Sequence, residues 1–431
     1  MKKFIFTMLC ISLLSLSSCG SMVTKAEESR SRFAKQKTTE TTEATEASTA
    51  AAESLTTEPA TEITSEVPDE IVLKGADTLE AGERITVEDF ISDTNFSILN
   101  GSDLVDTSQT GVIDVPVQLL CNGTPYDTTV QTLVQDTTPP VLLNSGSNAM
   151  VETGKVFNLT DVVGVGDNFD KIVNLSYDGV VDTSVAGKYP IHAYASDSSG
   201  NCTDWELTVS VLDTLPKAED NEPALPFDSF ISRYGGENRK LGIDVSKWQG
   251  DIDFNAVKNA GCEFVIMRIG YFGDEHDIDK YFLRNIEGAK AAGLEIGVYI
   301  YTTANSEDDV KANAKWIYEQ LGGQKLDFPV VFDWESFGTF QKYEMSIADL
   351  NHYYEVFDAE MKNYGYSTML YSSKNFLNNF WSVKEDYPVW LAHYVDDTDY
   401  TGSYKMWQMS CHGTIPGIYA PVDLNILYTD R

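Results

Sequence analysis

Basic residues are scarce in this chain of 431 residues, in which 31 Lys and Arg stand against 66 Asp and Glu. The formal net charge is therefore −35. Nucleic-acid binding depends on Lys and Arg that neutralise phosphates, so we expect no nucleic-acid partner. The same sign argues against electrostatic adhesion to anionic lipid. Hydrophobic residues make up 42% of the chain, which is enough for folded cores and excludes wholesale disorder.

Motifs for metals and cofactors are also missing. No C-x-x-C pair, G-x-G-x-x-G or phosphate loop occurs, so we expect no zinc site, no other metal and no cofactor. Four cysteines follow the N-terminal region, and the sequence leaves open whether Cys121 pairs with Cys202 or Cys262 with Cys411. The histidines are few and show no metal-binding spacing: His192, His276, His352, His393 and His412.

The N-terminus lacks a hydrophobic run long enough to span a bilayer permanently. Two lysines precede an apolar run from Phe4 to Leu16, a pattern typical of a secretory signal peptide over residues 1–18. The run closes on Leu16-Ser17-Ser18-Cys19, which resembles the lipobox of bacterial lipoproteins. This resemblance implies a lipid on Cys19 and an anchor in the membrane. The alternative is an ordinary secretory cleavage that leaves Cys19 without a lipid; both imply export.

Residues 19–67 are expected to form a lipid anchor and a disordered stalk. Of the 29 residues from 38 to 66, 26 are Thr, Glu, Ala or Ser, and none is Lys or Arg. Such a segment cannot bury enough apolar surface to offset its ordering entropy, and its carboxylates repel one another. It suits a tether that holds a folded domain away from a membrane.

The middle of the chain contains an internal repeat. Val105-Asp106-Thr107-Ser108 recurs as Val181-Asp182-Thr183-Ser184, and Val134 with Asp136 recurs as Val211 with Asp213, which predicts two units over 68–136 and 137–214. Their short β-branched runs and Asn-Gly or Ser-Gly-Asn turns predict small all-β sandwiches. The second unit resembles bacterial immunoglobulin-like domains. We favour a spacer role over carbohydrate or protein binding, because no aromatic cluster marks a face.

From Leu241 onward the sequence alternates between strand and helix patterns. A linker over 215–239 is expected to precede a domain over 240–431 that folds as an irregular β/α barrel of the TIM type. The whole chain is thus expected to be multidomain. Ser306 and Ser346 are the expected N-caps of two helices, and the later connections are too short for full helices. Eight strands are expected: 241–245, 264–269, 295–301, 329–333, 368–371, 388–393, 405–409 and 422–426.

Carboxylates fall at the carboxyl ends of these strands, where β/α barrels carry out their chemistry. Asp244 closes the first strand, Asp333 and Glu335 close the fourth, and Asp423 lies in the last. Because residues i and i+2 of a strand face one side, Asp333 and Glu335 are expected to share a pocket. Two carboxylates there push their pKa values apart, leaving one protonated and one ionised, as glycosidic cleavage requires.

The motifs of this region resemble glycoside hydrolase family 25, the lysozymes that cut between N-acetylmuramic acid and N-acetylglucosamine. The resemblance covers essentially all of 241–431 in the family's order. It departs at Phe254, where family members often carry Trp, a packing position away from the chemistry. The matching motifs include Asp244-Val245-Ser246-Lys247-Trp248-Gln249-Gly250, Gly297-Val298-Tyr299-Ile300-Tyr301, Pro329 to Glu335, Trp390-Leu391-Ala392-His393-Tyr394, Trp407-Gln408 and Val422-Asp423-Leu424-Asn425.

The resemblance implies a role for each carboxylate. Glu335 would be the general acid, and Asp333 either the nucleophile or the group that orients the substrate's acetamido group. Asp244 and Asp423 would line the cleft and bind substrate or tune the pair. The stereochemical configuration would be retained. Five aromatic residues are candidates for stacking on sugar faces, of which Tyr301 is the strongest because it ends a strand: Tyr299, Tyr301, Trp390, Tyr394 and Trp407.

The sequence therefore predicts a membrane-tethered lysozyme that hydrolyses peptidoglycan glycan strands. We expect a monomer, lipid-anchored on the outer side of a bacterial cell membrane and facing the cell wall. The main alternative is a surface lipoprotein that binds glycans without cutting them, against which the intact carboxylates argue. A third possibility is a hydrolase of foreign walls or of another N-acetylated glycan.

Overall fold

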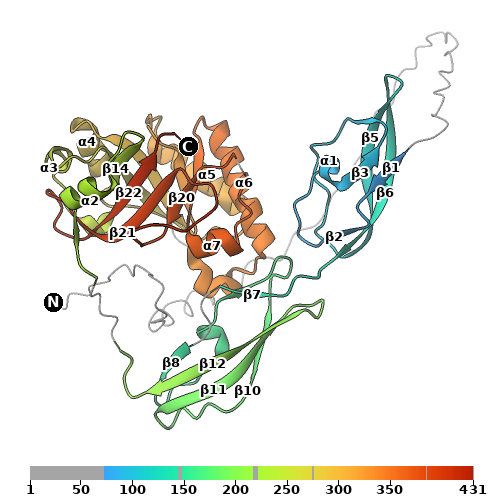
Figure 1. Ribbon diagram of the computed structural model, residues 1–431, viewed down its shortest axis with the longest axis horizontal. Coiled ribbons are helices and arrows are strands. Elements are labelled where there is room, and N and C mark those ends of the chain that lie inside the picture. The colour runs from blue at the N-terminus through green and yellow to red at the C-terminus, as the bar shows by residue number, and fades with distance from the viewer. Residues whose placement is uncertain (1–71, 144–147, 217–221, 274–275, 385, 431) are drawn as a thin grey trace, which may run out of the picture.

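The computed structural model describes residues 72–430 except 144–147, 217–221, 274–275 and 385 (Figure 1). The predicted signal peptide, Cys19 and stalk lie outside the described residues. The described chain forms two β units, drawn in blue and green, and a larger C-terminal domain. None of the helices in these described ranges is long and apolar enough to cross a bilayer.

The first β unit is a four-stranded sheet with a two-stranded ribbon beside it. The sheet order is β2-β6-β5-β4, and β1 pairs with β3 in the ribbon. Both contribute to one buried cluster around Phe90, Val117 and Leu119. Asn122 and Gly123, both at positive φ, make the turn between β5 and β6 as the Asn-Gly pair predicts. The elements are β1 Leu73–Gly75, β2 Thr78–Glu80, α1 Val87–Phe90, β3 Ile91–Thr94, β4 Ser97–Ile98, β5 Gly111–Cys121 and β6 Thr124–Gln135.

The second β unit repeats this topology. Its sheet order is β10-β11-β12-β8, with β7 and β9 paired beside it. In both units the first strand of the sheet lies parallel to the last, β2 on β6 and β8 on β12. The repeat predicted from sequence is thus a repeat of strand order. The elements are β7 Val141–Leu142, β8 Asn148–Glu152, η1 Leu159–Asp161, β9 Val165–Gly166, β10 Asn174–Asp178, β11 Gly187–Ser196 and β12 Cys202–Leu212.

The C-terminal domain is built on a closed ring of eight strands, drawn from yellow-green to red in Figure 1. Neighbours from β14 to β21 pair in parallel, and β22 closes the ring by antiparallel pairing with both β21 and β14. All eight predicted strands are present. They are β14 Arg239–Val245, β15 Phe264–Phe272, β17 Glu295–Thr302, β18 Val330–Asp333, β19 Thr368–Ser373, β20 Val389–Ala392, β21 Met406–Thr414 and β22 Val422–Tyr428, with β16 His276–Ile278 paired on β15.

Helices cover the outside of the ring, and their limits follow local sequence signals. Ser306 caps α5 and Gly322 ends it in the left-handed conformation, while Ser346 caps α6 with a capping box, as predicted. Connections shorten after β19, as the spacing indicated. The helices are η2 Lys247–Gln249, α3 Phe254–Asn259, α4 Phe282–Ala291, α5 Glu307–Leu321, η3 Ser336–Tyr343, α6 Ile347–Asn363 and α7 Lys374–Asn379.

The prediction that residues 215–239 form a linker is wrong for the second half of this range. Leu225–Pro226 form β13, which pairs with β21, and Phe227–Tyr234 form α2. Phe227 and Phe230 are at most 1% exposed in the core outside the ring, because α2 presents them on one side. This segment therefore belongs to the barrel domain.

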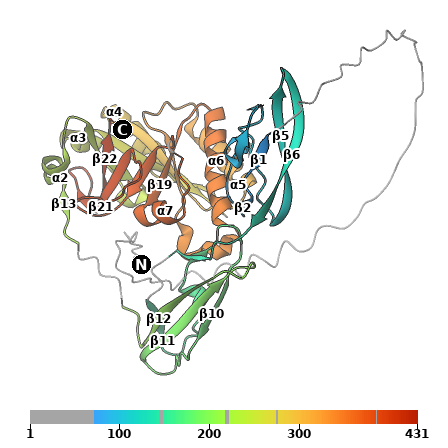
Figure 2. The ribbon, with the colours of Figure 1, turned by 45° about the vertical axis from the view of Figure 1, so that its right-hand side comes forward.

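The second β unit packs directly on the barrel domain, near α7 and the lower end of α6 in Figure 2. Gln341 of η3 accepts from the backbone N–H of Val173 at 2.8 Å and donates to the carbonyl of Val165 at 3.0 Å. A Cβ at Gly164 would lie 2.7 Å from the carbonyl oxygen of Phe337, so only glycine permits this approach. The unit thus contacts the helical turn that directly follows Glu335.

The described cysteines do not form the two disulfides that the sequence left open. Cys121, Cys202 and Cys262 are free thiols. Cys121 and Cys262 are buried, and burial raises the pKa of the Cys262 thiol to about 12. Cys262 is therefore a packing residue, since a protonated thiol is a poor nucleophile.

Candidate active site

Side chains of the ring strands alternate between an outer core and an inner face. The outer core contains Ile243, Phe332 and Leu424, so their neighbours Asp244, Asp333 and Asp423 point inward. Asp244 and Asp423 are directly opposite one another on the antiparallel pair of β14 and β22. Three of the four predicted carboxylates therefore meet inside the carboxyl-terminal end of the ring.

Glu335 reaches the same place by a different route from the one predicted. Strand β18 ends at Asp333, and Glu335 has the backbone angles φ −129° and ψ 4°, so the expected i, i+2 pair on one strand is wrong. Between them Trp334 is fully buried in the outer core, 4.9 Å from Phe337 between ring centroids. The anchored indole turns Asp333 and Glu335 toward the inner face.

Asp244 is held by a network of neutral donors. Its Oδ2 accepts from Gln408 Nε2 and from Asn425 Nδ2, each at 2.8 Å. Gln408 Oε1 accepts in turn from the hydroxyls of Tyr371 and Tyr394. Burial raises the pKa of Asp244 to about 6, and the two amide donors limit the rise. The carboxylate is thereby oriented without a cationic partner.

Asp333 and Glu335 form a coupled pair. Burial, and then the charge of Glu335, raises the pKa of Asp333 well above its ordinary value. The side chain of Glu335 is accessible at its surface, but the surrounding protein removes most of its hydration, which raises its pKa. Hydrogen bonds with Asp333 and Tyr371 oppose this rise. Two such carboxyls retain a shared proton to higher pH than isolated ones. The pair can therefore hold a proton at a pH at which isolated carboxyls have lost theirs.

Asp423 adds a further negative charge to the cluster. Its pKa is raised well above the ordinary value by burial and by the charges of Asp244 and Glu335. Arg268 on β15 lies close enough to lower the pKa of Asp333, but its guanidinium is paired with Asp279 Oδ2 at 2.7 Å. Among the described residues, no cationic side chain pairs directly with this cluster. Its carboxyls therefore retain protons to higher pH instead.

The predicted aromatic residues divide into three groups. Tyr299 and Trp390 are 5% and 2% exposed and pack against each other inside the ring, with ring centroids 6.3 Å apart. Tyr301 and Tyr394 are half-buried beside the carboxylates and remain accessible for a sugar face. The prediction that Trp407 stacks on a sugar is wrong. Its indole lies in the outer core against Tyr234 of α2 and donates to the carbonyl of His393, so it cannot reach the inner face.

Four polar residues of the site were missed from the sequence: Arg268, Tyr371, Gln408 and Asn425. Asn425 lies two residues after Asp423, and Gln408 two residues after the inward Met406. Strand periodicity would therefore have placed both on the inner face. Trp390 Nε1 donates to Asn425 Oδ1 at 2.8 Å, which fixes the amide that orients Asp244.

A closed strand ring with buried, proton-sharing carboxylates at its carboxyl-terminal end defines a glycosidase-like acid–base site. Residues 243–418 match the family model of glycosyl hydrolases family 25. The C-terminal domain is therefore similar to this family over most of its length.

Individual relatives are similar over the same domain. The chain is 33% identical to an autolytic lysozyme of Clostridium acetobutylicum over 43% of its own length and 54% of that protein's, so it spans about half of that relative. It is 27% identical to lysozyme M1 of Streptomyces globisporus over 43% of this chain and 66% of that one. The modular autolysin LytC of Streptococcus pneumoniae, solved with a synthetic peptidoglycan ligand, aligns with a TM-score of 0.42 at 23% identity, covering 55% and 56% of the two chains.

Proposed function

We propose that the protein hydrolyses the β-1,4 bonds between N-acetylmuramic acid and N-acetylglucosamine in peptidoglycan. The observation that carries the proposal is the cluster of Asp244, Asp333, Glu335 and Asp423 at one end of the ring, where burial raises the pKa of each. Similarity to two proteins named lysozymes supports the choice of substrate. The TIM-like β/α barrel predicted from sequence is the scaffold we propose for this site.

In the proposed mechanism Asp333 passes the shared proton to Glu335 and becomes ionised. Glu335 then protonates the leaving glycosidic oxygen. It is the accessible member of the coupled pair, so a substrate oxygen can reach it, whereas Asp333 is 4% exposed. Asp333 then stabilises the positive charge on the sugar ring, as nucleophile or by orienting the acetamido group. Tyr301 and Tyr394 offer ring faces to the bound sugars. Retention of configuration follows from either role of Asp333.

The test is digestion of purified peptidoglycan by the wild type and by Glu335→Gln. Removing a general acid costs roughly 10²–10⁴-fold in rate, so the variant should release new reducing ends at least 100 times more slowly. Glu319→Gln is the matched control, because Glu319 is exposed on α5 with only a 3.8 Å ion pair to Lys315. Neither variant should melt more than about 2 °C below the wild type, so that a loss of activity cannot be ascribed to unfolding.

The outcome separates the proposal from its alternatives. Sedimentation of the wild type with insoluble peptidoglycan but no new reducing ends would identify a binding protein instead of a hydrolase. Undiminished activity of Glu335→Gln would remove Glu335 from the proposed role. Mass spectrometry of released fragments, with N-acetylmuramic acid at the new reducing end, distinguishes this bond from those in other N-acetylated glycans.

We further propose that the protein is tethered to the outer side of the cell membrane through a lipid on Cys19. The support is the lipobox-like Leu16-Ser17-Ser18-Cys19 and the Thr- and Glu-rich stalk after it. An acidic enzyme gains no electrostatic attraction to an anionic wall, so confinement by a tether would raise its local concentration near substrate. Cys19→Ala should move the enzyme from the cell to the medium in active form. Continued retention on cells would contradict the tether.

The two β units are proposed to be immunoglobulin-like spacers between stalk and barrel. Their shared strand order and the two-part packing around one core support this assignment. As spacers they would set the distance between membrane and catalytic domain, while the docked second unit orients the barrel. Partners other than peptidoglycan and the membrane are not expected, and a monomer is proposed.

A further inference from the structure

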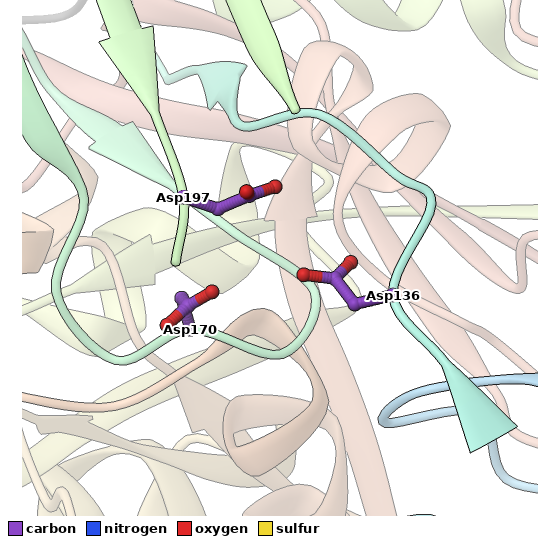
Figure 3. A group of neighbouring side chains, drawn as sticks. All are labelled: Asp136, Asp170 and Asp197. Atoms are coloured by element: carbon purple, nitrogen blue, oxygen red, sulfur yellow. The ribbon is translucent and has the colours of Figure 1, made fainter. Parts of the chain in front are cut away.

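Three aspartates outside the barrel meet where the first β unit joins the second. Asp136 directly follows β6, Asp170 lies between β9 and β10, and Asp197 directly follows β11. Figure 3 shows the three carboxylates pointing toward one another from three separate segments. One carboxylate oxygen of each lies within 4.8 Å of the other two. Three negative charges at this spacing repel one another unless a positive charge lies between them.

The buried carboxylate of Asp136 provides a second, independent indication that a ligand binds between the three aspartates. The residue is 8% exposed, and both of its carboxylate oxygens are buried without a hydrogen-bond donor. A buried carboxylate with no donor is costly, since it loses its hydration and gains nothing in return. The side chain nevertheless points toward Asp170 and Asp197, as Figure 3 shows.

The other two aspartates are held in place by their own loops. Asp170 Oδ2 accepts from the backbone N–H and the hydroxyl of Ser198, at 3.1 and 3.0 Å. Asp197 Oδ1 accepts from the backbone N–H groups of Gly200 and Asn201, and its Oδ2 from the Asn201 side chain at 2.8 Å. Each carboxylate oxygen has two lone pairs, so these bonds orient the groups and leave capacity for a cation.

The chemistry of the donors selects the ion. All three side chains are hard oxygen donors, with neither His nor Cys among them, which disfavours zinc and other soft metals. Calcium takes six to eight oxygens in flexible geometry, whereas magnesium demands a near-ideal octahedron and retains its waters. Three carboxylates supply up to six oxygens, and they come from loops without a regular octahedral arrangement. The site therefore favours calcium over magnesium.

We propose that Asp136, Asp170 and Asp197 bind one calcium ion at the junction of the two β units. The ion ties the end of the first unit to two loops of the second and fixes the angle between them. The sequence predicted no metal because it has no His or Cys residues at metal-binding spacing. Aspartates 34 and 27 positions apart, from 136 to 170 and from 170 to 197, form no linear motif.

The same loop also contacts the barrel domain. The carbonyl oxygens of Asp167 and Asn168 accept from the backbone N–H groups of Ile347 and Ala348, at 2.7 and 3.3 Å. These are the first two residues of α6, whose N–H groups have no partner within the helix. Lys171 adds an ion pair to Asp349 at 3.0 Å. Calcium at Asp170 therefore orders a loop that caps a barrel helix.

The direct test is isothermal titration of calcium chloride into the full-length chain after treatment with EGTA and desalting. We expect one calcium per chain and a rise in melting temperature on adding calcium to the EGTA-treated protein. Asp136→Asn should bind calcium at least about tenfold more weakly, because it removes one ligand charge. Asp178→Asn is the matched control: Asp178 is an exposed aspartate of β10 that accepts only from Tyr194 in the same unit.

Each result decides the proposal. Absence of calcium binding by the wild type up to millimolar concentration would overturn it, as would equal calcium affinity in wild type and Asp136→Asn. Magnesium binding as tight as calcium binding would overturn the choice of ion. If Asp136→Asn fails to fold, Asp197→Asn and the effect of calcium on the wild-type melting temperature provide the same decision.

Discussion

The carboxylates in the barrel and those at the junction of the β units lie in different surroundings. In the barrel, Asp244 receives its hydrogen bonds from the side-chain amides of Gln408 and Asn425. At the junction, Asp197 and Asp170 receive theirs largely from backbone N–H groups of one tight loop. In the proposed lysozyme site, amides and phenols on the strands fix a carboxylate beside the pair that would exchange protons with a substrate. Loop donors hold carboxylates around a point that a cation can occupy.

The difference lies in how repulsion between carboxylates is relieved. In the barrel it is relieved by protons, because burial and mutual charge raise the pKa values of Asp333 and Glu335. At the junction we infer that it is relieved by a divalent ion. A site that must change its charge during a reaction uses protons, whereas a site that only joins segments benefits from a permanent counter-charge.

Replacing Asp244 by Asn tests the charge coupling within the barrel and has the larger expected effect. The charge of Asp244 raises the pKa values of Glu335 and Asp333, so its removal lowers them. The alkaline limb of the kcat/KM profile should therefore move to lower pH. The Asn oxygen can accept from both Gln408 and Asn425 in place of Oδ2. An unmoved limb would show that Asp244 does not tune the pair.

The same variant should change the pH dependence of stability. The folded pKa of Asp244, about 6, exceeds its ordinary 3.8, so stability that depends on its protonation is present below about pH 4 and lost as pH rises through 6. Asn does not titrate. The variant should therefore melt at the same temperature as the wild type at pH 4 and about 5 °C higher at pH 8. A difference that is independent of pH would contradict the assigned pKa.

Much of the barrel could be predicted from the sequence because its signals are local. The eight strands are short apolar runs, and the caps at Ser306, Ser346 and Gly322 are set by single residues. The four carboxylates followed from their positions at strand ends. Trp407 was misplaced because an aromatic residue suits either side of a strand. It directly follows the inward Met406, so strand alternation puts it on the outer side.

Features that depend on distant segments could not be predicted. The aspartates of the junction come from three loops, and only folding brings them within 4.8 Å. The docking of the second β unit on η3 relies on Gln341, whose side chain satisfies two backbone groups more than 165 positions away. Nothing in the local sequence distinguishes this glutamine from an exposed one. The spacer prediction for the second unit therefore missed its contact with the C-terminal domain.

Replacing Gln341 by Ala tests whether that contact matters to the barrel site, with a smaller expected effect. The change leaves the N–H of Val173 and the carbonyl of Val165 without partners in residues that are 6% and 0% exposed. Leaving buried polar groups unpaired should lower the free energy of unfolding by about 2 kcal/mol, measured by urea denaturation. Replacing its exposed neighbour Lys342 by Ala should change the free energy of unfolding by less than about 0.5 kcal/mol.

Because η3 begins directly after Glu335, a loosened turn in Gln341→Ala should also lower kcat without altering the pH profile. An effect on the position of Glu335 is thereby distinguished from an effect on its charge. Equal stability of the two variants would mean that the β unit rests on the barrel without supporting it.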